Sequence, residues 1–263
     1  TGNYNTANGN GALYSNTEGN QNVASGYGAL FSNIDGINNT ASGPQVLYSN
    51  TEGNENTASG SYALYSNTTG NENTASGSGA LYSNTTGSQN TANGRAALNN
   101  NISGDHNTAS GYQVLFGNTT GTYNTASGEQ ALYTNTTGSY NTAIGHAADV
   151  ASAALTNATA IGNQATVNAS NTMQLGNTSV TNVKTSGSVT AGAITIPNTD
   201  GSTGQLLATD GSGQLYWLTL VPLTEAQASA ITANTVKTGI TSDQANAITA
   251  NTAKTVLALG TTS

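Results

Sequence analysis

The 263-residue chain has no cysteine, three prolines, and four Lys and Arg residues against twelve Asp and Glu residues. Without cysteine, disulfides and thiolate metal sites are excluded. The net charge of −8 provides no basic surface to neutralise phosphates, so we expect no nucleic-acid partner. No apolar run approaches the ~18 residues of a membrane span, so we expect no membrane insertion. The chain begins with Thr1, and no signal-like segment follows, which indicates a processed form or a fragment.

Large apolar side chains are also scarce, since aromatic residues make up 6% of the chain and 32 residues are glycine. Such a composition would usually indicate disorder, but disordered chains also favour proline and high charge. This chain instead repeats itself: an asparagine recurs every seventeen residues from Asn5 to Asn141 without insertion or deletion. That regularity predicts a solenoid, in which each coil buries its face against its neighbours.

One coil reads N-T-A-S-G, a variable pair, A-L-Y-S-N-T-T-G and a second variable pair, as in Asn56 to Glu72. Two strand-sized pieces joined by turns predict a parallel β-solenoid, so the fold is all-β. The glycines of the Gly19 column fit corners that need a positive φ or a close approach between coils. The asparagines of the Asn16 column are expected to stack into a hydrogen-bonded ladder. The inward column of the core comprises Leu13, Leu30, Leu47, Leu64, Leu81, Leu98, Leu115 and Leu132.

An aromatic residue follows most of these leucines and, by alternation, points to the opposite face. One Leu, small alanines and one ring offer little burial per coil, so we expect this stripe to be covered by another chain. The alternative is a half-exposed aromatic ladder on a monomer. Asn99 interrupts the stripe, in the same coil as Arg95. The possible inter-chain stripe comprises Tyr14, Phe31, Tyr48, Tyr65, Tyr82, Phe116 and Tyr133.

From Gly145 the seventeen-residue register is expected to fail, and T-A-I-G occurs at 142–145 and 159–162. These residues, with Ala165, resemble the head repeats of trimeric autotransporter adhesins, which fold as left-handed parallel β-rolls. The N-T-A-x-G-x-x-A-L repeats, together with 171–179 (NTMQLGNTS), are also similar to phage tail fibre proteins. The resemblance covers about residues 1–220. It implies a homotrimeric fibre and does not indicate a receptor.

We therefore divide the chain into a repeat shaft (1–145), a second β-roll (146–182), a junction (183–221) and helical linker repeats (222–263). Asp210-Gly211 is a hairpin signal within the junction, and the apolar cluster around Trp217 is expected to plug a trimer core. Capping boxes at Thr224 and Thr241 predict two short helices, which would trimerise or link the chains.

Catalytic residues are not expected. Glu18, Asp35 and Glu52 share one repeat position and would form an acidic column, but a turn on a convex rod provides neither a cleft nor a desolvated acid. A solvated edge or adventitious Ca²⁺ binding is the remaining reading. His106 and His146 occupy different repeat positions, so no metal site is expected, and no cofactor is indicated.

Together these patterns predict a non-enzymatic, elongated, homotrimeric shaft or attachment appendage, resembling a phage tail fibre, on a virion or at a cell surface. A bacterial adhesin and a self-assembling extracellular filament need the same rod and remain alternatives. An outward Thr column (Thr40 and its equivalents) leaves an ice-binding solenoid as a further alternative. The variable pairs are the places for cell-surface glycan contacts, at Tyr27, Tyr62 and Tyr112.

Overall fold

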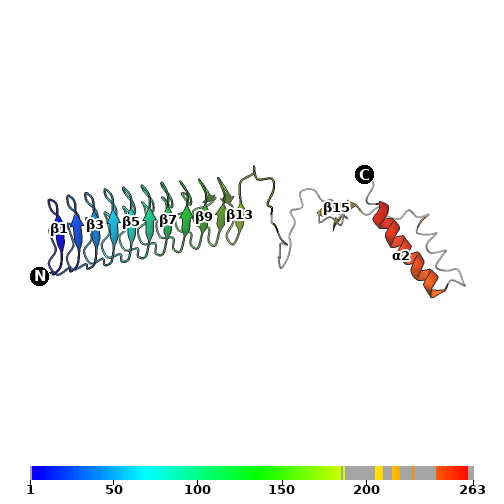
Figure 1. Cartoon of the computed structure of the whole chain (residues 1–263), viewed down its shortest axis with the longest axis horizontal. Helices are drawn as coiled ribbons and strands as arrows, with labels where there is room; N and C mark the ends of the chain where they lie inside the picture. Colours follow the sequence, from blue (N-terminus) through cyan, green and yellow to red (C-terminus); the bar gives the residue numbers. More distant parts are fainter. Residues whose placement is uncertain are drawn as a thin grey trace. The chain divides into compact units, whose positions relative to one another are not determined.

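The computed structural model describes residues 2–184, 186, 205–209, 215–219, 227 and 241–259. The chain divides into two compact units, residues 1–184 and 185–263, which are described separately. In the first unit the chain winds into coils that stack in one row (Figure 1). This part is a parallel β-solenoid, as the seventeen-residue period predicts.

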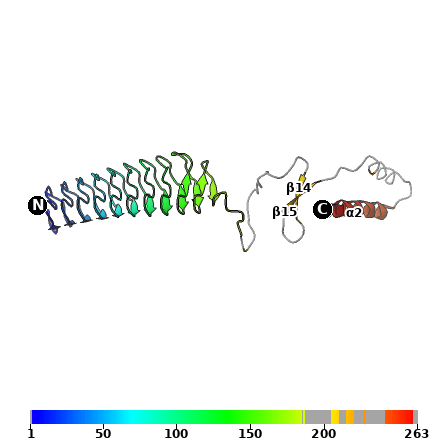
Figure 2. The same cartoon turned by 90° about the horizontal axis from the view of Figure 1, so that it is seen from above.

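Eleven short parallel strands form one sheet in the order β1 to β9, β11, β13, with each coil contributing one strand. Neighbours pair in strict register, so that Thr57 lies beside Thr74 and Ala58 beside Ala75. Figure 2 shows these strands along one side of the row of coils. The strands are β1 (Thr6–Asn8), β2 (Val23–Ser25), β3 (Thr40–Ser42), β4 (Thr57–Ser59), β5 (Thr74–Ser76), β6 (Thr91–Asn93), β7 (Thr108–Ser110), β8 (Thr125–Ser127), β9 (Thr142–Ile144), β11 (Thr159–Ile161) and β13 (Met173–Leu175).

Each strand of the repeat region turns its middle alanine into the core and its two flanking residues outward. The leucine column lies opposite the alanines: Leu30 and its equivalents through Leu132 are fully buried. Leu13 is only partly buried, and Ala7 is exposed, because the first coil has a neighbour on one side only. The core is therefore a narrow column of Ala and Leu side chains, with a few Val, along the coil axis.

The leucine segment is not the second strand that the alternating pattern predicts. In every repeat coil it is a turn, with the leucine φ between 50° and 53°, in the left-handed region that non-glycine residues rarely adopt. The turn still bonds to the next coil, since Leu64 N donates to Ala80 O at 2.9 Å and Ser66 N to Tyr82 O at 3.0 Å. Burial of the side chain and these bonds offset the conformational cost.

Two asparagine ladders run through the coils. In the predicted one, Asn67 Nδ2 donates to Asn50 Oδ1 at 2.7 Å and to Gly70 O at 3.0 Å. The second uses the first residue of each coil: Asn73 Nδ2 donates to Asn56 Oδ1 at 3.1 Å and to Gly87 O at 2.8 Å. Across the described residues, no buried side-chain nitrogen or oxygen lacks a hydrogen-bond partner. The buried asparagines can therefore be part of the core because each amide has its hydrogen-bond partners.

The glycines of the Gly19 column are required by close approach rather than by a positive φ. A Cβ on Gly36 would lie 2.6 Å from Gly53 O and 2.5 Å from Asn33 Oδ1. The positive φ values that the fold does require of glycine belong to another column, the last residue of N-T-A-S-G, with φ of 127° at Gly43 and 122° at Gly60. Close approach between coils and a positive φ are therefore both present, but in two different glycine columns.

The seventeen-residue register does not fail at Gly145, and this expectation was wrong. Thr142 still pairs with Thr159, and Asp149 with Thr166 across a second parallel sheet of β10 (Asp149–Val150) and β12 (Thr166–Val167). The spacing shortens to fourteen only at the last step, where Thr159 pairs with Met173. The expected segments 1–145 and 146–182 accordingly belong to one unit.

In the second unit, β14 (Gln205–Thr209) and β15 (Leu215–Thr219) pair antiparallel, as the hairpin signal predicts. Helix α2 spans Ser242–Leu259 and begins at the predicted capping box, where Thr241 N donates to Gln244 Oε1 at 3.0 Å. The first expected helical unit, apart from Gln227, lies outside the described residues, as does the Asp210-Gly211 turn. Among the described residues, no helix combines the length and apolar character needed to cross a membrane.

Candidate functional site

The aromatic stripe is a continuous stack over five coils. Each ring follows the buried leucine of its turn, so the rings recur once per coil and lie face to face. Centroids are 5.0 Å apart for Tyr14 and Phe31, 4.9 Å for Phe31 and Tyr48, 5.3 Å for Tyr48 and Tyr65, and 5.2 Å for Tyr65 and Tyr82, with interplanar angles of 10° or less. Stacking covers the ring faces and leaves the ring edges outward.

The stripe is only partly covered by its own chain. Tyr14, at the first coil, is 75% exposed, and the inner positions are half-buried, with Tyr82 37% and Tyr133 39% exposed. The stripe therefore presents a row of half-exposed aromatic edges, without a formal charge at any of its positions.

Asn99 interrupts this stack. The rings resume at Phe116 and Tyr133, which lie 5.4 Å apart, and in the described residues no ring contact joins Tyr82 to Phe116. The Asn99 amide Nδ2 donates to Gly79 O at 2.9 Å, in the preceding coil. In another coil an aromatic ring occupies the equivalent place. Tyr48 lies against Gly28 as Asn99 lies against Gly79, and a Cβ built on Gly28 would be 3.1 Å from the Tyr48 ring.

The three tyrosines proposed as glycan contacts do not converge on one site, because they belong to different coils. Tyr27 is 61% exposed. Tyr62 leans against the stripe, with its ring 5.8 Å from Tyr65 and 6.3 Å from Tyr82 at 54°. The guanidinium carbon of Arg95 lies 5.6 Å from the Tyr112 ring centroid, a cation–π arrangement.

A second, shorter ring stack was missed by the sequence analysis. His106 stacks on Tyr123 at 4.5 Å, and Tyr123 on Tyr140 at 5.1 Å. These residues close their coils with φ between 57° and 61°. Their seventeen-residue spacing was visible in the sequence, but the same position holds Gln, Asn or Glu from Gln21 to Gln89, which concealed the pattern.

The acidic columns lie at exposed turns of the coils. Glu18, Asp35 and Glu52 are exposed at one turn position, as a solvated edge requires. In the neighbouring column, Glu72 Oε2 accepts a hydrogen bond from Gln89 Nε2 at 3.1 Å. Within the described ranges, no group of three or more His, Asp or Glu side chains gathers where a metal ion could be held.

Asp149 is the one described carboxyl in a distinctive environment. It has the sequence position of the core leucine, but the neighbouring Val150 is the residue buried in the core of this coil. Partial burial raises the pKa of the Asp149 carboxyl, although hydrogen bonds from Thr134 and Val150 oppose that rise. Val150 N donates to Oδ1 at 2.8 Å and Thr134 N to Oδ2 at 3.1 Å. No second titratable group is among these partners, so the carboxyl is a structural feature of the last coils.

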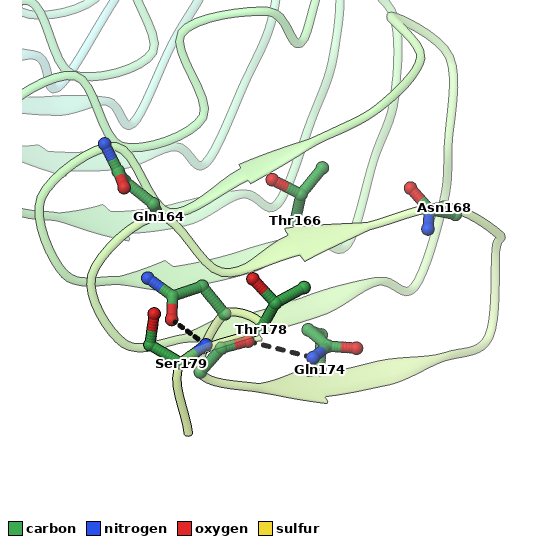
Figure 3. Close-up of a pocket in the computed structure, with 8 residues that line it drawn as sticks. Gln164, Thr166, Asn168, Gln174, Thr178 and Ser179 are labelled. Carbon is green, nitrogen blue, oxygen red and sulfur yellow. Dashed lines mark hydrogen bonds between the residues drawn. The ribbon is translucent and has the colours of Figure 1, made fainter. Parts of the chain in front are cut away.

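A hollow of about 500 Å³ lies at the end of the solenoid, between β12 and the segment that follows β13 (Figure 3). Gln174 Nε2 donates to Gly176 O at 2.8 Å and Ser179 N to Asn177 Oδ1 at 2.9 Å along its wall. Amides and hydroxyls line it, so its walls offer hydrogen-bond donors and acceptors to a small polar molecule. Its lining residues are Gln164, Thr166, Asn168, Gln174, Gly176, Asn177, Thr178 and Ser179.

Comparison of the chain with protein-family models, with curated proteins and with solved structures finds no match.

Proposed function

We propose that the chain is the non-enzymatic shaft of an elongated attachment fibre, in which three copies associate through the aromatic stripe. The observation that carries this proposal is the row of stacked rings, half-buried or more exposed, along a solenoid whose own core consists of Ala, Leu, a few Val and paired Asn. Aromatic edges of this kind gain by burial against a neighbour. A second copy of the chain fits best, since its rings have the same spacing per coil.

The fold supports a mechanical role. Backbone bonds join successive coils at the strand and at the leucine turn, and the two ladders add amide bonds at both. Rigid stacking of this kind would hold a binding site away from the point where the fibre is fixed. Exposed tyrosines in the variable pairs, Tyr27, Tyr62 and Tyr112, would contact a cell-surface glycan. The fibre would belong to a virion or a cell surface, as a phage tail fibre, a bacterial adhesin or an extracellular filament.

Adsorption tests the attachment role. Fluorescently labelled chain is incubated with a panel of bacterial cells and with polysaccharide-coated beads. Replacing Tyr27, Tyr62 and Tyr112 by alanine should lower retention at least several-fold, whereas Ser78→Ala, at an exposed variable position, should leave it unchanged. If the triple variant and the unmodified chain were retained equally on every surface that binds, these tyrosines would not be the glycan contacts.

A second candidate is favoured by the outward face of the main sheet. Thr40, Thr57 and Thr74 are exposed in register on successive strands, with an exposed serine two residues after each. Such regular hydroxyl rows could order water at an ice surface. Val23 breaks the threonine row, and Ile144 and Ile161 replace serine, which weakens this candidate. Thermal hysteresis at micromolar protein would support it, and its absence would end it.

A further inference from the structure

Asn99 is the one stripe position between residues 14 and 133 that carries no ring. It lies off-centre: five rings precede it, at Tyr14 to Tyr82, and two follow, at Phe116 and Tyr133. Its side chain is half-buried, and the amide donates one N–H to Gly79 O. An amide has a second N–H and an acceptor oxygen. These remain for a group outside the coil.

A perfectly periodic stripe would give associating chains no unique alignment. If one chain slid by one coil, about 4.8 Å, every ring except the one at an end of each stripe would again face a ring. Identical repeats therefore leave the axial register degenerate, in the same way that a strand with two equivalent faces has a weakly specified register. Something in the stripe must differ from coil to coil for a fibre to have one defined structure.

We propose that Asn99 fixes the axial register and the parallel direction of the associated chains, an inference that rests on the proposed association through the stripe. In register, the Asn99 amides of the copies meet, and each amide oxygen accepts the free N–H of a neighbour. A slip of one coil would press each amide against Tyr82 or Phe116 of another copy, and the amide would lose its partners. An antiparallel pairing of fully overlapping stripes would place it against Tyr48. A single polar residue within an apolar interface specifies alignment in this manner, at a cost in stability.

Filling the interruption is sterically possible, which makes the inference testable. Gly79 faces position 99 as Gly28 faces Tyr48 and Gly11 faces Phe31. Asn99→Tyr should therefore continue the stack without displacing the backbone. The same comparison allows the interruption to be moved, because an asparagine at position 48 would lie over Gly28 as Asn99 lies over Gly79.

The register is measured by single-molecule energy transfer between chains. Because the sequence has no cysteine, a donor can be placed on Ser25→Cys chains and an acceptor on Ser127→Cys chains, which are refolded together. These exposed strand positions lie six coils apart, about 29 Å along the axis at ~4.8 Å per coil, so a slip of one coil changes the axial separation by about 5 Å. The unmodified stripe should give one narrow distance population.

Asn99→Tyr should give two or more populations about 5 Å apart, while the assembly itself persists. The double variant Tyr48→Asn/Asn99→Tyr, which moves the interruption by three coils, should restore one population. Asn100→Ser, which gives the neighbouring residue the serine of the preceding coils, is the matched control and should also keep one population.

Assembled Asn99→Tyr chains with the same single population as the unmodified chains would overturn the inference and leave the association intact. Molar mass is recorded on each sample, so the two proposals can fail separately. Monomers in every sample would overturn the association, and the register inference with it.

Discussion

At the scale of single residues, the protein replaces a large apolar core with paired amides. Asn50, Asn67 and Asn84 are fully buried, and each Nδ2 has two acceptors, one in its own turn and one in the preceding coil. A buried amide contributes only when all its partners are present, because each unpaired group costs about 1–3 kcal/mol. Stability therefore depends on side chains that composition alone would count as surface residues.

Asn67→Ala should destabilise the solenoid by about 1–3 kcal/mol, since the change leaves the buried Oδ1 of Asn50 without its donor and removes one of the two acceptors of Asn84 Nδ2. Asn67→Asp keeps the shape but loses both donors, so it should be at least as harmful at neutral pH. Thr69→Ala, exposed in the same turn, should stay within about 0.5 kcal/mol. Denaturant unfolding measures all three, and an Asn67→Ala chain as stable as Thr69→Ala would refute the ladder's role.

Asp149 should make stability depend on acid pH in a direction opposite to that of a salt-bridged carboxyl. Burial raises its pKa in the folded chain above the ordinary value of 3.8, so the folded state binds the proton more readily than the unfolded state. The melting temperature of the unmodified chain minus that of Asp149→Asn should therefore rise as the pH falls from 7 through the folded pKa, and level off below 3.8. A difference that shrinks on acidification would show that the pKa is lowered instead.

At the scale of one coil, the glycine at the corner sets how closely coils can stack. Gly36→Ala would bring a methyl group within 2.6 Å of Gly53 O and 2.5 Å of Asn33 Oδ1. Neither neighbour can retreat without breaking a ladder bond, so we expect a loss of several kcal/mol and local separation of coils. Ser42→Ala, exposed on β3, serves as the control. Hydrogen exchange should then show that amide protection is lost first in residues 22–55, the two coils that contain Gly36 and Gly53.

The coil was largely predictable from the sequence because its signals are local. The seventeen-residue period predicts the parallel stack, and the Asn16 column predicts one ladder. The strand in the leucine segment was wrongly predicted, because the alternation of apolar and polar residues does not reveal that Leu64 adopts a φ of 51°. A conformation so rare for leucine is imposed by the coils above and below, which a pattern within one coil does not contain.

The end of the solenoid was harder to predict. At residues 146–157 the residue types change while the seventeen-residue spacing does not, so the sequence suggested a boundary where the sheet continues. The spacing shortens by three residues only one coil later, between β11 and β13, and the polar hollow lies there. Which groups line a hollow depends on contacts between coils, so the sequence analysis gave no signal for it.

At the scale of the whole molecule, the proposed fibre requires that other copies of the chain cover the stripe. The row of stacked rings is half-exposed in a single chain, and its interruption at Asn99 would then act between chains. Truncating Tyr48, Tyr65 and Tyr82 to serine should raise the protein concentration needed for association at least tenfold. Circular dichroism should show that the coils persist.

The molar mass of the full chain in solution, measured by light scattering over a micromolar concentration series, tests this account most directly. One chain has a mass of 26.2 kDa, so three copies give 78.6 kDa. We predict 78.6 kDa for the unmodified chain and a shift toward 26.2 kDa on dilution of the Tyr48→Ser/Tyr65→Ser/Tyr82→Ser variant. A mass of 26.2 kDa for the unmodified chain at every concentration would contradict the account.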